Sequence, residues 1–98
     1  MTANGARGEV LRSLGGVERR LCLTLGTLAE LETALEVDGI GALAERLRRL
    51  SARDLVTVLA ALLRGGGEIE AAESLPSAAV GFREAAEAVA AAFTAAGR

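Results

Sequence analysis

The spacing of apolar residues changes once along the chain and divides it into two parts. Residues 8–24 alternate between apolar and polar side chains on either side of the pair Gly15-Gly16. Alternation is typical of strands, and two glycines suit a two-residue hairpin turn because both turn positions take a positive φ angle. We therefore predict a β-hairpin over residues 8–24. Its register places Arg12 opposite Arg19, which is unfavourable because like charges face each other across the ladder.

Beyond the hairpin, apolar residues recur every three or four positions, which is the spacing of amphipathic helices. Ser51 and Asp54 are a near match to a capping box, in which a side chain bonds to a backbone amide in the first turn. Residues 65–67 are three glycines, a helix-ending signal that we interpret as a flexible joint. These signals predict helices over about residues 25–37, 40–50, 52–64, 68–75 and 79–96.

The predicted fold is mainly α, or a small α+β fold, with an N-terminal β-hairpin followed by a bundle of four to five helices. The length of 98 residues fits one domain. We expect a flexible N-terminal tail over residues 1–7 and a single domain over residues 8–98. In that domain, residues 8–24 form the hairpin, 25–64 the helical core, 65–78 a joint with a short helix, and 79–96 the C-terminal helix.

The composition argues against an enzyme, a cofactor-binding protein and a metalloprotein. The chain has 21 Ala and 16 Leu but no His and no Lys. Histidine is the commonest general base and metal ligand, and lysine is needed for Schiff-base chemistry and for a Walker-type phosphate loop. Cys22 is the single cysteine, too few for an internal disulfide or a thiolate zinc site, and we expect it to be a small strand residue. We expect no catalytic, cofactor-binding or metal-binding residues.

Charge and hydropathy also limit the partners. The net charge of −2 argues against a general nucleic-acid binder, which needs a positive surplus. The most apolar run, residues 85–96, is interrupted by Glu87 and is shorter than the roughly 20 residues of a membrane-spanning helix. The polar start of the chain shows no signal-peptide pattern. We expect a cytoplasmic protein that does not bind membranes and is not a general nucleic-acid binder.

Two charged groups have a functional interpretation beside the ordinary one of a solvated helix face. Glu84 and Glu87 share a face because they are three residues apart, and paired carboxylates can perform acid–base chemistry when burial makes their pKa values differ.

Arginines gather where the second and third predicted helices meet, at the place where a helix-turn-helix protein would bind DNA or where an acidic partner would bind. Asp54 at this place repels phosphate and argues against DNA. The arginines are Arg46, Arg48, Arg49 and Arg53.

The apolar stripes are the pattern that most favours a binding function. In the last predicted helix, Phe82, Ala86, Val89 and Phe93 form one stripe. A domain of this size with so much Ala, Leu and Val has more apolar surface than one small core hides, so we expect self-association or binding of a partner helix. The candidate partner-binding residues are Leu55, Val58, Leu62, Phe82, Val89, Phe93, Arg46 and Arg49.

Several segments resemble a family of small tail proteins from gene transfer agents and related siphophages. The most specific segment is Leu23–Glu32, LTLGTLAELE, inside a longer matching run that begins at Arg20. The resemblance covers residues 8–67, and members of the family are labelled gene-transfer-agent family protein, tail tube-associated protein or tail assembly chaperone. The remaining segments that carry it are Gly8–Val10, Gly15-Gly16, Ser51–Leu55 and Leu62–Gly67.

The resemblance implies a non-enzymatic role in tail assembly. The leading hypothesis is a chaperone that binds the tape measure protein, keeps this long helical chain soluble and is absent from the finished particle. The first alternative is a structural, tube-associated component that stays in the particle and has the tail tube protein as a partner. The second alternative is a small helical DNA-binding regulator that uses residues 46–53. A homo-oligomer is compatible with each of these roles.

Overall fold

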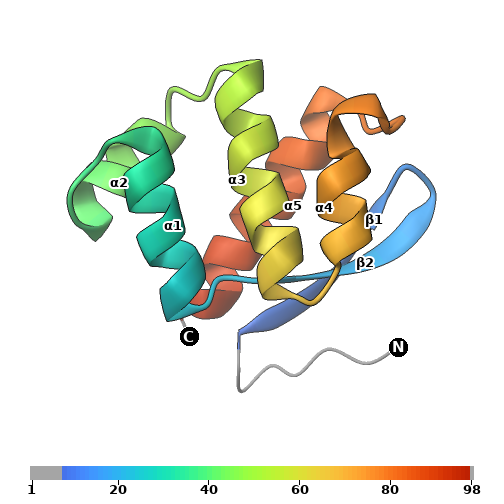
Figure 1. Cartoon of the computed structure of the whole chain (residues 1–98), viewed down its shortest axis with the longest axis horizontal. Coiled ribbons are helices and arrows are strands. Elements are labelled where there is room, and N and C mark those ends of the chain that lie inside the picture. The colour runs from blue at the N-terminus through green and yellow to red at the C-terminus, as the bar shows by residue number, and fades with distance from the viewer. Residues whose placement is uncertain (1–7, 98) are drawn as a thin grey trace.

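The computed structural model describes residues 8–97, over which a two-stranded antiparallel sheet is followed by helices (Figure 1). The elements are β1 (Glu9–Leu14), β2 (Val17–Cys22), α1 (Leu25–Leu35), α2 (Ile40–Leu47), α3 (Ala52–Gly65), α4 (Ile69–Ser74), the short 3₁₀ helix η2 (Leu75–Ser77) and α5 (Phe82–Ala96). The predicted mainly α fold with an N-terminal hairpin is confirmed. The tail predicted over residues 1–7 lies outside the described residues.

Helix α3 is the centre of the fold. Figure 1 shows it between α1 and α4 with α5 behind it, and it contacts α1, α4, α5 and β2. Val58, Ala61 and Leu62 have no exposed surface, and Leu59 and Leu63 are 1% exposed. A helix that is apolar on nearly every side is stable only when neighbours cover nearly every side. The other elements are therefore arranged around α3.

The hairpin has the predicted register, and a glutamate from outside it relieves the repulsion between its arginines. Arg12 lies opposite Arg19, and the turn glycines have φ angles of 62° and 85°. The Arg19 guanidinium lies 3.4 Å from a carboxylate oxygen of Glu68, which comes just before α4. The other oxygen of Glu68 accepts the backbone N–H of Arg20 at 2.9 Å. Glu68 therefore balances one of the opposed charges and attaches β2 to the helices.

Side-chain caps begin two helices where the sequence predicts them. Thr24 precedes α1, and its hydroxyl oxygen accepts the N–H of Thr27 at 3.0 Å. Ser51 precedes α3, and its hydroxyl oxygen accepts the N–H of Asp54 at 3.1 Å. Each bond satisfies one backbone amide that the first turn of a helix leaves without a partner. The Ser51 cap predicted from the sequence is confirmed.

Two helices are shorter than their apolar spacing suggests. The second predicted helix extends to Leu50, whereas α2 ends at Leu47 because the next amides bond three residues back and tighten the chain into a turn. The last predicted helix starts at Ala79, whereas α5 starts at Phe82 after an extended segment that brings Val80 against the core.

Helix α1 buries Leu31 but leaves Leu25 83% exposed, so the predicted leucine stripe begins outside the core.

The glycine run after α3 packs against β2. A Cβ atom on Gly65 would overlap the carbonyl oxygen of Cys22, and one on Gly66 would overlap that of Arg20. Only Gly67 of the run has a positive φ angle, 85°, with open space around it. The first two glycines therefore let the helix end approach the strand closely, a role different from the flexible joint that the sequence suggested. Cys22 is a buried strand residue, as predicted.

Helix α5 packs through its small residues, which corrects the predicted stripe. Its buried face consists of Ala85, Ala88, Val89 and Ala92. These side chains allow α5 to lie close to α3 and β1, with which it makes most of its contacts. The stripe of larger residues is rotated towards one edge of this face, and Phe82 is 63% exposed. Of this stripe, Val89 is buried, Ala86 and Phe93 pack against the core, and Phe82 is left exposed.

Candidate functional site

An apolar groove runs between α5 and the corner where α2 leads into α3. It has a volume of about 310 Å³, and all four residues of the stripe predicted on the last helix line it from α5. A single charged side chain, that of Arg48, belongs to the lining. The lining residues are Leu47, Arg48, Leu50, Leu55, Phe82, Ala86, Val89, Ala90 and Phe93.

A second apolar hollow of about 210 Å³ adjoins the first between α3, η2 and the start of α5. Leu55 and Phe82 line both hollows. Phe82, which is 63% exposed, lines both hollows, and Val56 adds a further exposed apolar side chain to the second. We call the two hollows together the Phe82 groove. Both of its hollows are lined mainly by apolar side chains.

Some of the candidate residues from the sequence line the Phe82 groove, and others are buried in the core. Leu55, Phe82, Val89 and Phe93 all line the groove. Val58 and Leu62 are completely buried in α3 and do not line the groove. Leu47 and Leu50 were not among the candidates, although their place in the apolar stripe of the second helix was a usable signal. The sequence could not show which residues of each stripe would stay accessible.

The arginines near the groove have different roles. Arg46 donates to Asp54 from two nitrogens, at 3.1 and 2.9 Å, and to the backbone carbonyl of Leu35 at 2.7 Å. It therefore joins the end of α1 and the start of α3 to α2. Arg48 lies 3.2 Å from Glu45, but both side chains are largely exposed, and such a pair contributes little to stability. Arg49 is exposed beside it.

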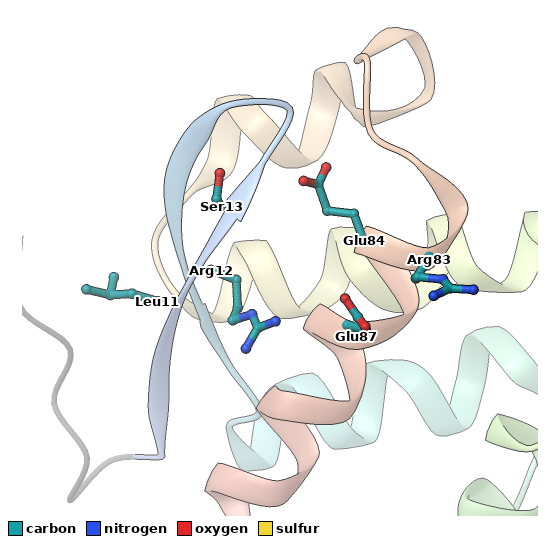
Figure 2. A pocket seen from close by; sticks show the side chains of 6 residues that line it. All are labelled: Leu11, Arg12, Ser13, Arg83, Glu84 and Glu87. Atoms are coloured by element: carbon teal, nitrogen blue, oxygen red, sulfur yellow. The ribbon is translucent and has the colours of Figure 1, made fainter.

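A second, polar groove lies between β1 and α5, with a volume of about 640 Å³. Glu84 accepts the N–H of Gly15 at 3.0 Å, so this carboxylate caps the hairpin turn. Figure 2 shows Glu84 and Glu87 on the side of α5 that faces β1, and Arg12 of β1 pointing towards α5, whereas Arg83 points away. The predicted carboxylate pair is therefore part of a polar groove, and one of its members has a structural bond. The lining residues are Leu11, Arg12, Ser13, Arg83, Glu84 and Glu87.

Two searches of residues 8–97 gave negative results. No three His, Cys, Asp or Glu side chains come close enough there to hold a metal ion. No helix in that range combines the length and the apolar character that crossing a membrane requires.

Comparison with known proteins identifies one family. A family model described as "Phage tail tube protein, GTA-gp10" matches residues 7–97. No curated protein and no solved structure matches the chain. The family match includes the Ala-rich α5, which lies beyond the segments that carried the resemblance in the sequence.

Proposed function

The chain belongs to the phage tail tube protein family GTA-gp10, and from this premise we propose that it is a structural component of a tail. In this proposal the Phe82 groove contacts a neighbouring tail protein and the chain stays in the finished particle. The family's description is structural and favours this role over that of a chaperone, which was the leading hypothesis from sequence.

The exposed ring of Phe82 is the observation that supports a contact at this place. An aromatic side chain between two apolar hollows is a typical anchor of a protein interface, because it can bury a large area at little cost in side-chain entropy. Full burial of a Phe side chain stabilises a contact by about 2–3 kcal/mol. In the isolated chain most of this contribution is unused, since Phe82 is 63% exposed.

The border of the groove suggests the chemistry of the partner's surface. Arg48 lines the groove and its side chain is 77% exposed, with Arg49 next to it. A partner segment with an apolar face and carboxylates along one side would fill the hollows and pair with these arginines. Such pairing guides orientation and association rate more than it adds affinity.

A second candidate function is the tape measure chaperone. It is favoured by the form of the groove, which runs between helices and is lined by an i, i+4, i+7, i+11 stripe of α5. Grooves of this form receive amphipathic helices. A helical tape measure protein would then occupy the groove during assembly and leave it later.

Mass spectrometry of purified particles distinguishes the two functions. The structural proposal requires the chain in finished particles at a constant ratio to the other tail proteins. The chaperone requires the opposite result: co-purification with the tape measure protein from cells, and loss from particles. Absence from particles would therefore overturn the structural proposal, and failure to co-purify would remove the chaperone as well.

A further inference from the structure

Helix α2 and the turn after it form one wall of the Phe82 groove, and α2 is lightly held. Leu47 at its C-terminal end and Arg48 directly after it line the groove, whose other wall is α5. Leu43 is the one residue of α2 that is buried, whereas α5 buries four. Figure 1 shows α2 at the edge of the molecule, beside α1, which it contacts. The groove therefore has one firmly packed wall and one with little buried surface.

The sequence of α2 gives it little stability of its own. The helix has 8 residues, fewer than the roughly 12–15 below which isolated helices are marginal in water. Its cap residue is Gly39, which has no side chain to bond to a first-turn amide, unlike Thr24 before α1 and Ser51 before α3. Gly41 lies in the first turn, where glycine is a poorer helix former than alanine. α2 therefore depends on its contacts with other helices.

Arg46 makes the side-chain bonds that tie α2 to those helices. Its guanidinium donates to Asp54 of α3 and to the backbone carbonyl of Leu35 at the end of α1. Within residues 8–97, no other side chain of α2 makes a hydrogen bond to a different helix. The Arg46 and Asp54 side chains are 33% and 16% exposed, so water competes for the pair. One partly exposed group of bonds and the buried Leu43 hold α2 in place.

The chain can bend on both sides of α2. Before the helix, Gly39 has a φ angle of 91° and open space around it. After the helix, the amides of Arg48 and Arg49 bond three residues back in an exposed turn. Hinges are typically a few loop or helix-end residues of this kind. A movement of α2 therefore needs no rearrangement of buried backbone at either end.

We infer that α2 detaches as a unit while the other helices and the hairpin stay packed, and that its detachment opens the Phe82 groove. Segments with few buried apolar contacts open at a lower free energy than the whole fold. In the detached state Leu47 no longer closes one side of the groove, and Leu43 leaves the core. A partner that binds the open form more tightly than the closed form shifts the chain towards it. Arg46 opposes this opening.

The consequence for binding rests on the proposed function, in which the groove contacts a tail protein. The detachment of α2 does not, because it is measured on the purified chain alone. If α2 does not detach, the role in the tail is untouched. If the chain is absent from particles, the detachment of α2 is untouched.

Native-state amide hydrogen exchange by NMR tests the detachment. After correction for intrinsic rates, we expect the amides of Leu43–Leu47 to exchange at least tenfold faster than those of Leu59–Leu63 in α3. Arg46→Ala removes the tie and should speed exchange in α2 about fivefold. Gly41→Ala adds a methyl group with nothing within 4 Å, and it should slow exchange in α2 severalfold because alanine favours the helix.

Glu68→Ala is the matched control, because it weakens the fold away from α2. Glu68 binds the backbone of Arg20 and the side chain of Arg19, both on β2. Its removal should speed exchange of the Leu59–Leu63 amides about tenfold, since these are exposed by global unfolding, and should leave exchange in α2 unchanged. Urea at low concentration is the second measurement, on the parent chain. It should speed exchange in α3 more steeply than in α2, because detachment of α2 exposes less surface.

Binding of the dye anilinonaphthalene sulfonate tests whether detachment opens the groove. This dye binds exposed apolar surface, and we expect Arg46→Ala to bind severalfold more of it than Gly41→Ala. The dye is an anion, so loss of the Arg46 charge by itself would lower binding and cannot produce this result.

Two results would overturn the inference. If Glu68→Ala or urea speeds exchange in α2 as much as in α3, α2 opens only when the whole chain unfolds. If Arg46→Ala and Gly41→Ala bind the dye equally, α2 detaches without opening the groove. Should Glu68→Ala fail to fold, the urea dependence of the parent chain still decides the first point.

Discussion

Two contacts of the central helix α3 differ in how completely they are closed. Where α3 meets β2, Gly65 and Gly66 leave no room for a methyl group, and Glu68 binds a backbone amide of the strand. Where α3 meets α5, small residues pack closely on one side, but Phe82 stays 63% exposed between two hollows. The first contact is closed within the chain, and the second leaves an apolar side chain exposed.

The difference separates the residues that maintain the fold from those that are available for assembly. Close backbone packing and a satisfied buried amide contribute to the stability of one chain and offer nothing to another. An exposed aromatic ring contributes little to the stability of the isolated chain but much to an interface. Substitutions at the two contacts should therefore affect different measurements.

The largest effect on stability is expected from Gly66→Ala. The added methyl group would overlap the Arg20 carbonyl, which is backbone and cannot rotate away, so the helix end must shift from the strand. We expect a loss of about 3 kcal/mol in the free energy of unfolding, which is the upper end of the usual cost of adding a methyl group to a tightly packed site. Urea denaturation followed by circular dichroism measures it.

Gly67→Ala is the matched control for that prediction. Gly67 has a positive φ angle but open space around it, so alanine costs only its conformational strain, about 1 kcal/mol. If both variants lose the same free energy, the glycines act through backbone conformation alone, and the close approach to β2 has no energetic role.

A smaller loss is expected from Glu68→Ala. This change removes the acceptor of the Arg20 amide and the partner of Arg19, whose charge then faces Arg12 without compensation. An unsatisfied buried donor costs about 1–3 kcal/mol, and because this bond is only partly buried we expect about 1.5 kcal/mol in urea denaturation. Glu68→Gln keeps an acceptor and should lose about half as much. A loss in Glu68→Gln equal to that in Glu68→Ala would mean that charge, not the amide bond, is what matters.

Arg46→Ala is expected to cost about 1 kcal/mol, because its bonds to Asp54 and to the Leu35 carbonyl are partly exposed to water. Arg48→Ala is the control, since its pair with Glu45 is far more exposed, and it should change stability by less than about 0.5 kcal/mol. Thermal denaturation at low and high salt compares the two. Equal losses would show that Arg46 does not join the helices.

The fold could largely be predicted from local signals, and the site only in part. The hairpin register followed from Gly15-Gly16, and the α3 start followed from Ser51, because turns and caps depend on residues close in sequence. The partner of Arg19 could not be predicted, since Glu68 is 49 residues away. Patterns of neighbouring residues do not show which residues far apart in the sequence come into contact.

The exposed face of α5 shows the same limit. Spacing alone identified Phe82, Val89 and Phe93 as one stripe, and all three do line a single groove. Spacing could not show that alanines would form the buried face, because that depends on how closely α3 and β1 approach. On α5 the size of the side chains, and not only their polarity, determines which apolar residues are buried and which remain accessible.

The smallest effect on stability, and the largest on assembly, is expected from Phe82→Ala. Because the ring is 63% exposed, its removal should change the free energy of unfolding by less than about 0.5 kcal/mol. Its contribution to a contact with a tail protein should be lost, so we expect a severalfold drop in the amount of the chain in purified particles by mass spectrometry. Ile69→Ala is the matched control, since Ile69 is 50% exposed on α4, away from the groove. If both variants enter particles like the parent chain, the Phe82 groove is not the contact; if both fail, exposure of apolar residues in general is what assembly requires.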